Sequence, residues 1–403
     1  MTKQKNRALM WTILLMSLMQ MPEFAILAGT DLIAKEFFPE LVLRMSPERV
    51  LPTVQTAMTL PGIVAVFAGI SSSLLIRYGL STKKTPAVLG LASIALTGVV
   101  AILLNTRFWQ LSFMNILIGA GMGICVPSAQ SIMFDNFDEK TRQFITGIQF
   151  ACINIGGLIM SLIGGFLNTL VWYGGHLVML IAVPVAIVAI LFIPKDKKIK
   201  PAAPGKNIVR TKLPSGVYYN TFMIVIFMIL YNVATVNIST HLVQHNLGDQ
   251  STAGIATALL MGGGIVSGLF FPKLSPIFRD HLFSITFFLL ALGFLLMSLF
   301  PASLAITFIA MFLCGITISL LIARCIFNVS NLSDPTNSAT STMLVCCIAP
   351  GSGQFLSPII ITNLTLIIGG ESTRFRFLFS AIVCIVLAVI LLAYNIYREK
   401  KTA

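Results

Sequence analysis

The sequence predicts an all-α integral membrane protein whose twelve transmembrane helices form two bundles of six. Hydrophobic residues make up 56% of the 403-residue chain and charged residues only 10%, whereas about a quarter of the residues in soluble domains are charged. The hydrophobic residues occur in repeated runs of about twenty, the length with which a helix crosses a bilayer. Because these runs are apolar all round, they do not fit the alternating strands of a membrane barrel.

The predicted spans fall into two groups of six, separated by one long polar stretch. The first six are expected near residues 8–29, 51–76, 86–105, 109–134, 143–170 and 174–194. The other six are expected near residues 217–243, 252–278, 282–300, 303–330, 338–368 and 375–397. The apolar run that begins at Ala8 is similar to a signal peptide, but it continues to about Ala28 and opens a series of spans. It is therefore predicted to be the first transmembrane helix.

The polar stretch between the two groups defines the domain organisation. Between Lys195 and Pro214 the chain has seven Lys or Arg residues, three Pro and one Asp. This composition favours a solvated linker over a packed core. We therefore expect an N-terminal bundle over residues 1–194, a linker over 195–216 and a C-terminal bundle over 217–403.

The two halves of the sequence are similar to each other near their fourth spans. Setting Gly119 against Gly315 brings Asp138 onto Asp334, each at the same end of its span. Together with the equal numbers of spans, this match favours parallel six-helix repeats related by an axis along the membrane normal.

The basic residues predict the orientation of the chain in the membrane. With twelve spans, both termini and the linker lie on one side, and the segments on that side carry 20 of the 27 Lys and Arg residues. The segments on the other side carry six, among which we count Arg374 and Arg376. Positive charge favours the cytoplasmic side, so we expect cytoplasmic termini in a plasma or inner membrane. The net charge of +13 then reflects topology and not a nucleic-acid site.

Two stretches carry the signature of a known family. Between spans two and three, Arg77 and Gly79 occupy positions of the loop motif G-x-x-x-D-R-x-G-R-K, with Ile76 in place of its Asp. In span four, Asn115 precedes Gly119 by four residues, where many proton-coupled members of that family have an arginine. On these residues the chain resembles the major facilitator superfamily of secondary transporters over essentially its whole length.

The resemblance implies a fold and a mechanism. Gly164 and Gly165 match the last glycines of a motif in span five of family exporters, whose Gly-Pro pair is replaced here by Met160 and Ser161. The implied fold has two six-helix bundles that rock about a central site, giving alternating access in a monomer. The loop motif here lacks the Asp on which the family builds a gating ion pair.

Charged residues inside spans are the most informative candidates, since an unpaired charge in hydrocarbon costs several kcal/mol. Glu23, next to Pro22 in span one, is expected to carry a proton or to act as counter-charge to a cationic substrate; alternatively, hydroxyl groups or water hold it. Arg324 in span ten is expected to bind a carboxylate or phosphate of the substrate. The alternative is that it reaches the inner interface or bonds carbonyl groups at helix ends.

Neutral polar residues in the spans are further candidates for substrate contacts. The expected contacts are Gln20, Gln130, Tyr231, Asn232 and Asn237. Gln55 and Gln354 are weaker candidates, because most such residues simply bond across packed helices. His241 shares a helical face with Asn237, but a single His near an outer helix end is more often solvated.

These residues predict a secondary active transporter that moves a small organic solute, with an organic anion as the best guess and the proton as the coupling ion. The alternative is an efflux antiporter for amphipathic drugs. An enzyme would show ionisable residues clustered at one depth, and a sensor would show an added soluble domain; the sequence predicts neither. It also has no nucleotide-binding loop, no metal-ligand spacing among its seven cysteines and no evident cofactor motif.

Overall fold

The computed structural model describes residues 3–77, 81–82, 84–137, 139–194, 213–332, 341 and 343–402. Within these ranges every regular element is a helix, and eleven helices are long and apolar enough to cross a membrane. The first span adds a shorter apolar helix over Arg7–Leu18. The predicted all-α fold with twelve membrane helices is therefore confirmed, whereas most of the linker 195–216 lies outside the described residues.

The helices of each half follow one another with short connections. The N-terminal half contains α1 (Lys3–Leu18), α2 (Phe24–Leu27), α3 (Thr30–Leu41), α4 (Pro47–Arg77), α5 (Lys84–Leu103), α6 (Phe108–Asn136), α7 (Glu139–Leu170), α8 (Gly174–Leu177), η1 (Val178–Ile181) and α9 (Ala182–Phe192). The C-terminal half contains α10 (Ser215–Gln244), α11 (Gln250–Phe278), α12 (His281–Leu299), α13 (Leu304–Leu332), η2 (Leu344–Ile348), α15 (Ala349–Ser357), η3 (Pro358–Thr362), α16 (Asn363–Ile367) and α17 (Thr373–Thr402).

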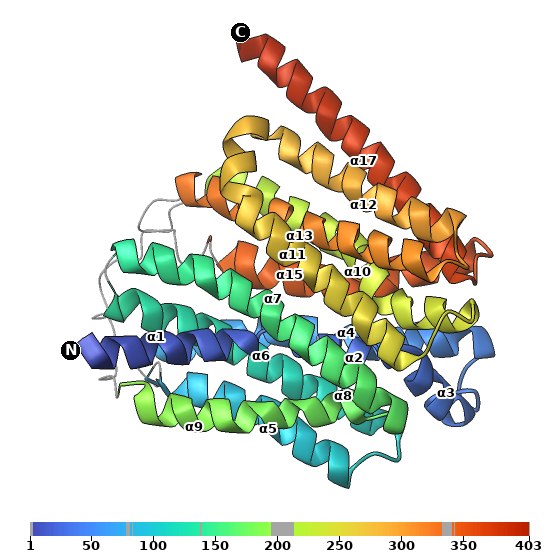
Figure 1. Cartoon of the computed structure of the whole chain (residues 1–403), viewed down its shortest axis with the longest axis horizontal. Helices are drawn as coiled ribbons and strands as arrows, with labels where there is room; N and C mark the ends of the chain where they lie inside the picture. The colour runs from blue at the N-terminus through green and yellow to red at the C-terminus, as the bar shows by residue number, and fades with distance from the viewer. Residues whose placement is uncertain are drawn as a thin grey trace.

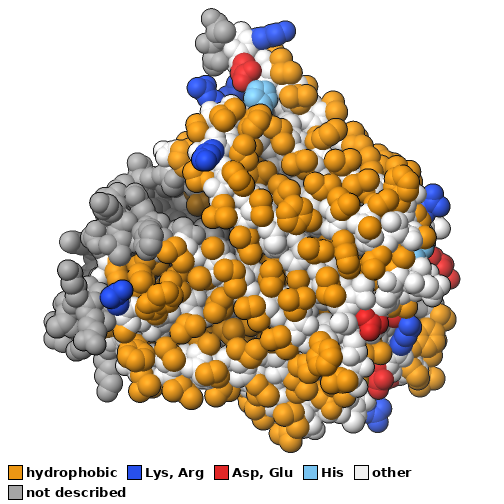
Figure 2. Space-filling model, in the orientation of Figure 1, with side chains coloured by type: hydrophobic (Ala, Val, Ile, Leu, Met, Phe, Trp, Pro, Cys, Tyr) orange, Lys and Arg blue, Asp and Glu red, His pale blue; other side chains and the backbone are white. Residues whose placement is uncertain are grey.

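The two halves form two layers (Figure 1). The N-terminus lies at the left of the view and the C-terminus at the top, left of centre, and we call this end of the molecule the terminus side. The opposite end, which carries α3, is called the α3 side. Hydrophobic side chains cover most of the visible face between the two ends, and the charged side chains gather toward the ends (Figure 2). This distribution is the one expected of a surface that meets lipid tails.

The first span is broken where Pro22 occurs. Helix α1 ends at Leu18, and α2 begins only at Phe24. Proline lacks a backbone N–H and its ring clashes with the preceding turn, so it interrupts a continuous helix. The expected span 8–29 is therefore divided into α1 and α2, with the opened backbone next to Pro22 between them. The chain continues as α3, which contains Asp31, a buried carboxylate that forms an ion pair with Lys35 at 2.8 Å.

Close contacts between glycines join the two halves. A Cβ atom on Gly165 of α7 would lie 2.7 Å from the Cα atom of Gly254 in α11. Likewise, a Cβ on Gly62 of α4 would lie 2.7 Å from the carbonyl oxygen of Gly351 in α15. Small residues let helix backbones approach in this way. Helices α7 and α11 converge toward the α3 side and diverge toward the terminus side (Figure 1), so the halves are packed together at the α3 side.

Two other motif glycines pack inside the N-terminal half. A Cβ on Gly119 of α6 would lie 2.5 Å from the carbonyl oxygen of Pro61 in α4, and one on Gly164 of α7 would collide with the backbone of Ala25. Gly164 therefore fixes α7 against the broken first span. These contacts hold in place the segment that carries Glu23.

Candidate functional site

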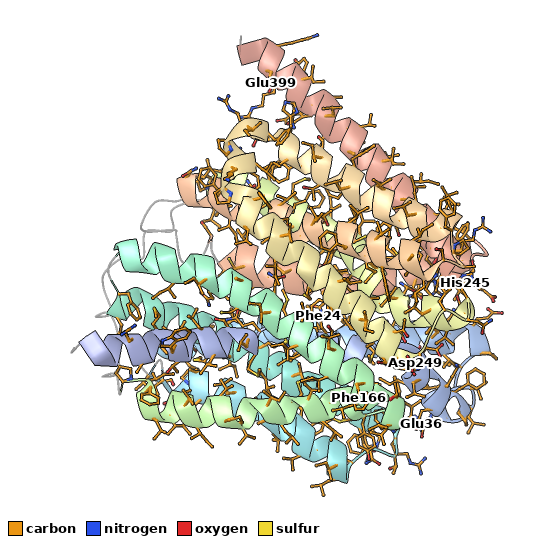
Figure 3. All side chains as sticks on the ribbon, in the orientation of Figure 1. Phe24, Glu36, Phe166, His245, Asp249 and Glu399 are labelled. Atoms are coloured by element: carbon orange, nitrogen blue, oxygen red, sulfur yellow. The ribbon has the colours of Figure 1, made fainter. Side chains whose placement is uncertain are left out.

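Glu23 lies in the break of the first span, between α1 and α2. Its side chain is 5% exposed and lies beside the side chain of Gln354 in α15, with which it interacts. Its Oε2 atom is buried and has no hydrogen-bond partner, and neither has Nε2 of the nearby Gln20. Because Gln354 belongs to the C-terminal half, the contact between Glu23 and Gln354 lies between the two halves. Figure 3 places Phe24, the next residue, near the middle of the molecule.

The eleventh span has an irregular geometry around Gln354. Its central segment, α15, lies between two π-helical segments, η2 and η3. Each π turn holds an extra residue and shifts the helical register, and such segments often occur at functional sites. Close packing of Gly351 on Gly62 brings α15 against α4. The α-helical segment between the two π segments thus presents Gln354 to the N-terminal half.

Within the described residues, Glu23 forms no ion pair. A charged carboxylate buried in this way costs several kcal/mol, so the site favours a protonated carboxyl or a bound cation. Both uses were expected from the sequence. The alternative in which water solvates the carboxyl does not agree with its burial.

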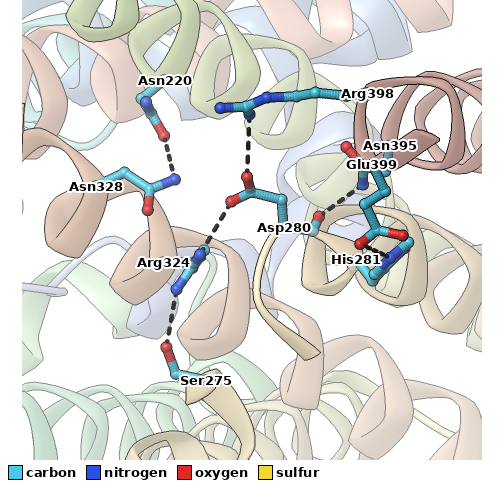
Figure 4. Close-up of polar contacts among 9 residues, drawn as sticks. All are labelled: Asn220, Ser275, Asp280, His281, Arg324, Asn328, Asn395, Arg398 and Glu399. Atoms are coloured by element: carbon cyan, nitrogen blue, oxygen red, sulfur yellow. Dashed lines mark hydrogen bonds and ion pairs between the residues drawn. The ribbon is translucent and has the colours of Figure 1, made fainter. Parts of the chain in front are cut away.

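Arg324 is held by its own half of the protein (Figure 4). Its Nη2 atom lies 2.9 Å from Oδ1 of Asp280, and its Nη1 donates to the Ser275 hydroxyl at 3.2 Å. Arg398 of α17 binds the second oxygen of the same carboxylate at 3.3 Å. The guanidinium also lies over the Phe327 ring, 5.6 Å from its centroid. This geometry favours the structural alternative for Arg324, because its donors bind Ser275 of α11 and Asp280 at the start of α12, a carboxylate that also binds Arg398 of α17.

We expect Arg324 and Asp280 to act as one stabilising unit. Arg324→Gln and Asp280→Asn should each lower the free energy of unfolding by about 1.5 kcal/mol, since each leaves a charged partner without its hydrogen bond. The double variant should be little worse than either single variant. Thermal melting of the purified protein in detergent measures this, with the exposed Arg279→Gln as control. Lost transport at unchanged stability in Arg324→Gln would instead support the substrate role.

The polar residues of α10 divide into two groups. Asn232 bonds within its own helix, donating to the Met228 carbonyl at 2.8 Å, and Tyr231 stacks on Phe227 with its hydroxyl buried and unpartnered. Asn237, by contrast, contacts other helices. Its Oδ1 atom accepts from Nε2 of Gln55 at 3.0 Å and from Nη1 of Arg376 at 2.9 Å. Of the candidates in span seven, Asn237 is therefore the one that joins the two halves.

Four buried residues form a polar network near the α3 side, which we call the α3-side network. It consists of Gln55, Asn237, Thr362 and Arg376, and none of them is more than 2% exposed. The Thr362 hydroxyl donates to Oε1 of Gln55 at 3.0 Å. Arg376, which the charge count placed in an outer segment, lies in the first turn of α17 and its side chain is buried. Its position within the apolar sequence Phe375-Arg376-Phe377 could have indicated this.

His241 is buried one turn from Asn237 and is not solvated. Its Nδ1 atom lies 3.0 Å from the Thr373 hydroxyl, and its ring centroid lies 4.7 Å from that of His245. His245 follows the end of α10 at the α3 side (Figure 3). Partial burial and the nearby Arg374 charge lower the pKa of His245 below its usual value. The His245 ring thus favours its neutral form beside His241.

The remaining motif residues have structural positions or lie outside the described part. Asn115 donates to the Ala57 carbonyl at 2.7 Å and lies 3.2 Å from Nε2 of His176, so it joins α4, α6 and α8 in place of the missing arginine. Arg77 ends α4, but its side chain lies outside the described residues. Gly79 and the side chain of Gln130 also lie outside the described residues.

Sequence comparison assigns the family. The chain matches the family model of the Major Facilitator Superfamily over residues 50–342 and belongs to this superfamily. A search of curated proteins finds no significant relative. Membership in this family indicates a transporter and not an enzyme.

Solved structures of transporters share the fold. A POT family transporter in complex with a thioalcohol-conjugated peptide has a TM-score of 0.72 at 13% identity, covering 96% of both chains. A bacterial homolog of the human lysosomal transporter Spinster, inward-facing and unoccupied, has a TM-score of 0.69 at 15% identity, covering 98% of this chain and 97% of its own. The human organic anion transporter MFSD10 (TETRAN) has a TM-score of 0.65 at 13% identity, covering 95% and 99%. At these identities the likeness establishes the fold.

Proposed function

We propose that this protein is a secondary active transporter that moves a small organic solute by alternating access, with the proton as coupling ion and Glu23 as the proton site. One observation carries the proposal: a buried carboxyl with an unpartnered oxygen lies beside the side chain of Gln354, which belongs to the opposite half. Protonation of Glu23 therefore acts on a contact that changes when the halves move.

The coupling follows from the cost of a buried charge. With a proton bound, the neutral Glu23 carboxyl is compatible with its closed environment. Without the proton, the carboxylate needs water or a cation, which favours a conformation in which the halves separate and expose it. A ligand shifts a conformational equilibrium by its differential affinity for the two states. The proton would act as that ligand, and the solute would be carried in the same cycle.

The excess of positive charge at the termini supports an orientation with cytoplasmic termini in a cell membrane. In this orientation the packed α3 side faces outward, and the conformation described here is inward-facing.

The carboxyl of Glu23 also supports a second candidate function. Without an ion-pair partner among the described residues, it would suit a cationic amphipathic compound exchanged for protons, as in drug efflux. Our expectation of an organic anion was based on Arg324, whose guanidinium is bound to Asp280. The substrate charge therefore decides between the two candidates.

Uptake into proteoliposomes tests the proposal. The purified protein would be offered matched sets of radiolabelled carboxylates, their neutral amides and the corresponding amines, with and without a pH difference of about one unit. We expect one charge class to accumulate only with the pH difference, and a protonophore to abolish the accumulation. If uptake of the carboxylates, the amides and the amines were all independent of the pH difference, this result would contradict proton coupling.

A further inference from the structure

We infer that Arg376 is the anion-recognition residue of the transport site, and that Gln55 occupies the place of the substrate anion in the conformation seen here. The inference rests on the proposed transport function and names its substrate class: a small organic solute with a carboxylate, phosphate or sulfonate group. It moves the anion-binding role from Arg324 to a residue of α17.

The charge of Arg376 is poorly compensated where it lies. The side chain is 2% exposed, and its one hydrogen bond among the described residues is that from Nη1 to Asn237. Its Nε atom is buried without a partner. Glu371 attracts it from the exposed turn before α17, but within the described residues no ion pair forms. Arg324, in contrast, has a carboxylate at 2.9 Å.

A buried arginine without a carboxylate is costly in a membrane protein, and such residues mark ion and substrate pathways. Guanidinium presents a planar set of donors that matches a carboxylate or phosphate in two-point contact. The unused donors of Arg376 therefore fit an oxyanion that is not part of the chain.

Gln55 is the member of the α3-side network that comes from the N-terminal half. It donates to the same Asn237 oxygen as Arg376 and accepts from the Thr362 hydroxyl. Its planar amide thus lies among polar groups of α10, η3 and α17. Because α4 moves with the N-terminal half, opening of the α3 side must withdraw Gln55 from this position.

Withdrawal of Gln55 would leave a site for an anion. The Thr362 hydroxyl would lose its acceptor, and Arg376 would retain its unused donors beside Asn237. The site would lie about 10 Å below the α3-side end of α10, counting seven residues from Asn237 to Gln244. A solute that enters from the α3 side would reach these donors when the halves separate, and its anionic group would replace the Gln55 amide.

Charged thiol reagents test this inference without knowledge of the substrate. In full-length Gln55→Cys, a thiol replaces the amide beside Asn237. We expect it to react with an anionic methanethiosulfonate reagent, carrying a sulfonate, and with the cationic trimethylammonium analogue. The measured quantity is the ratio of the two rates. Adding Arg376→Gln should lower the anionic-to-cationic ratio roughly tenfold, the lower range for electrostatic steering into a cleft.

Thr53→Cys provides the matched control. Thr53 lies two residues away on α4, and its hydroxyl bonds to Arg49 and Met45 instead of the network. Its rate ratio should not change with Arg376→Gln. Wild-type protein, which has its seven native cysteines but no introduced one, gives the background labelling. An unchanged ratio in Gln55→Cys, or no labelling at all, would overturn the inference and leave Arg376 a purely structural residue.

The solute panel separates this inference from the proposed function. We expect the transported class to be anionic, Arg376→Gln to reduce its uptake at least tenfold, and Arg376→Lys to restore part of it. If amines alone are transported in a proton-dependent way, the anion site is wrong and the proposed function stands. If no solute responds to the pH difference but anionic labelling still depends on Arg376, proton coupling is wrong and the anion site stands.

Discussion

Replacing Glu23 with Gln should abolish proton-driven accumulation of solute while preserving exchange of solute across the membrane. Glutamine keeps the size and a polar group beside Gln354 but binds no proton in the cycle. A pH difference of one unit corresponds to about 1.4 kcal/mol, and one proton per solute therefore supports about tenfold accumulation. In Glu23→Gln this accumulation should fall to equal concentrations on both sides.

The exchange rate gives a second measure of the same change. In wild-type protein, exchange should depend on pH, since the conformational change of the empty or loaded carrier depends on the proton at Glu23. In Glu23→Gln the side chain is permanently neutral, so exchange should become independent of pH. Asp31→Asn is a suitable control, because Asp31 is also a buried carboxylate but forms an ion pair with Lys35 at 2.8 Å. Retained pH-driven accumulation in Glu23→Gln would assign coupling to another group.

The spans and the break in the first span could be predicted because both depend on local sequence. Apolar runs of sufficient length must form helices in a bilayer, and Pro22 interrupts the helix that carries it. Glu23 was recognisable as a carboxylate inside such a run. Its position against Gln354 was not predictable, because the two residues are distant in sequence and belong to different halves.

The partners of Arg324 and Arg376 could not be predicted from the sequence. Arg324 binds Asp280, 44 positions away, and Arg376 binds Asn237, 139 positions away. Hydropathy places a polar residue along the membrane normal, but the rotation of each helix about its axis decides which neighbour it faces. That rotation comes from the packing of many side chains and, in the eleventh span, from two π segments that leave no clear sequence pattern. Arg324 was therefore identified as unusual, but not as paired.

A larger side chain at the glycine contact between the two halves should prevent closure of the α3 side. Gly254→Val adds a Cβ that would lie 2.5 Å from the Ser161 carbonyl oxygen and 2.9 Å from the Gly165 Cα atom. These are backbone atoms of the opposite half, so the contact is relieved by separating α7 from α11. Overpacking of this kind costs about 1–3 kcal/mol, which shifts the closed population by roughly 5- to 150-fold. Transport should fall by a similar factor, since alternating access requires both conformations.

Gly262→Val is the matched control, because it makes the same change of residue on the same helix while its added Cβ meets nothing within 4 Å. It should retain transport within about twofold of wild type, the effect of helix propensity alone. Labelling of Gln55→Cys measures the conformation directly: Gly254→Val should raise the labelling rate and Gly262→Val should not. Gly254→Val could instead lower thermal stability without raising the labelling rate of Gln55→Cys. That result would mean that the Gly165–Gly254 contact stabilises the fold and does not control closure. In that case closure of the α3 side depends on the polar network, since Gln55 would still be held by Asn237 and Thr362.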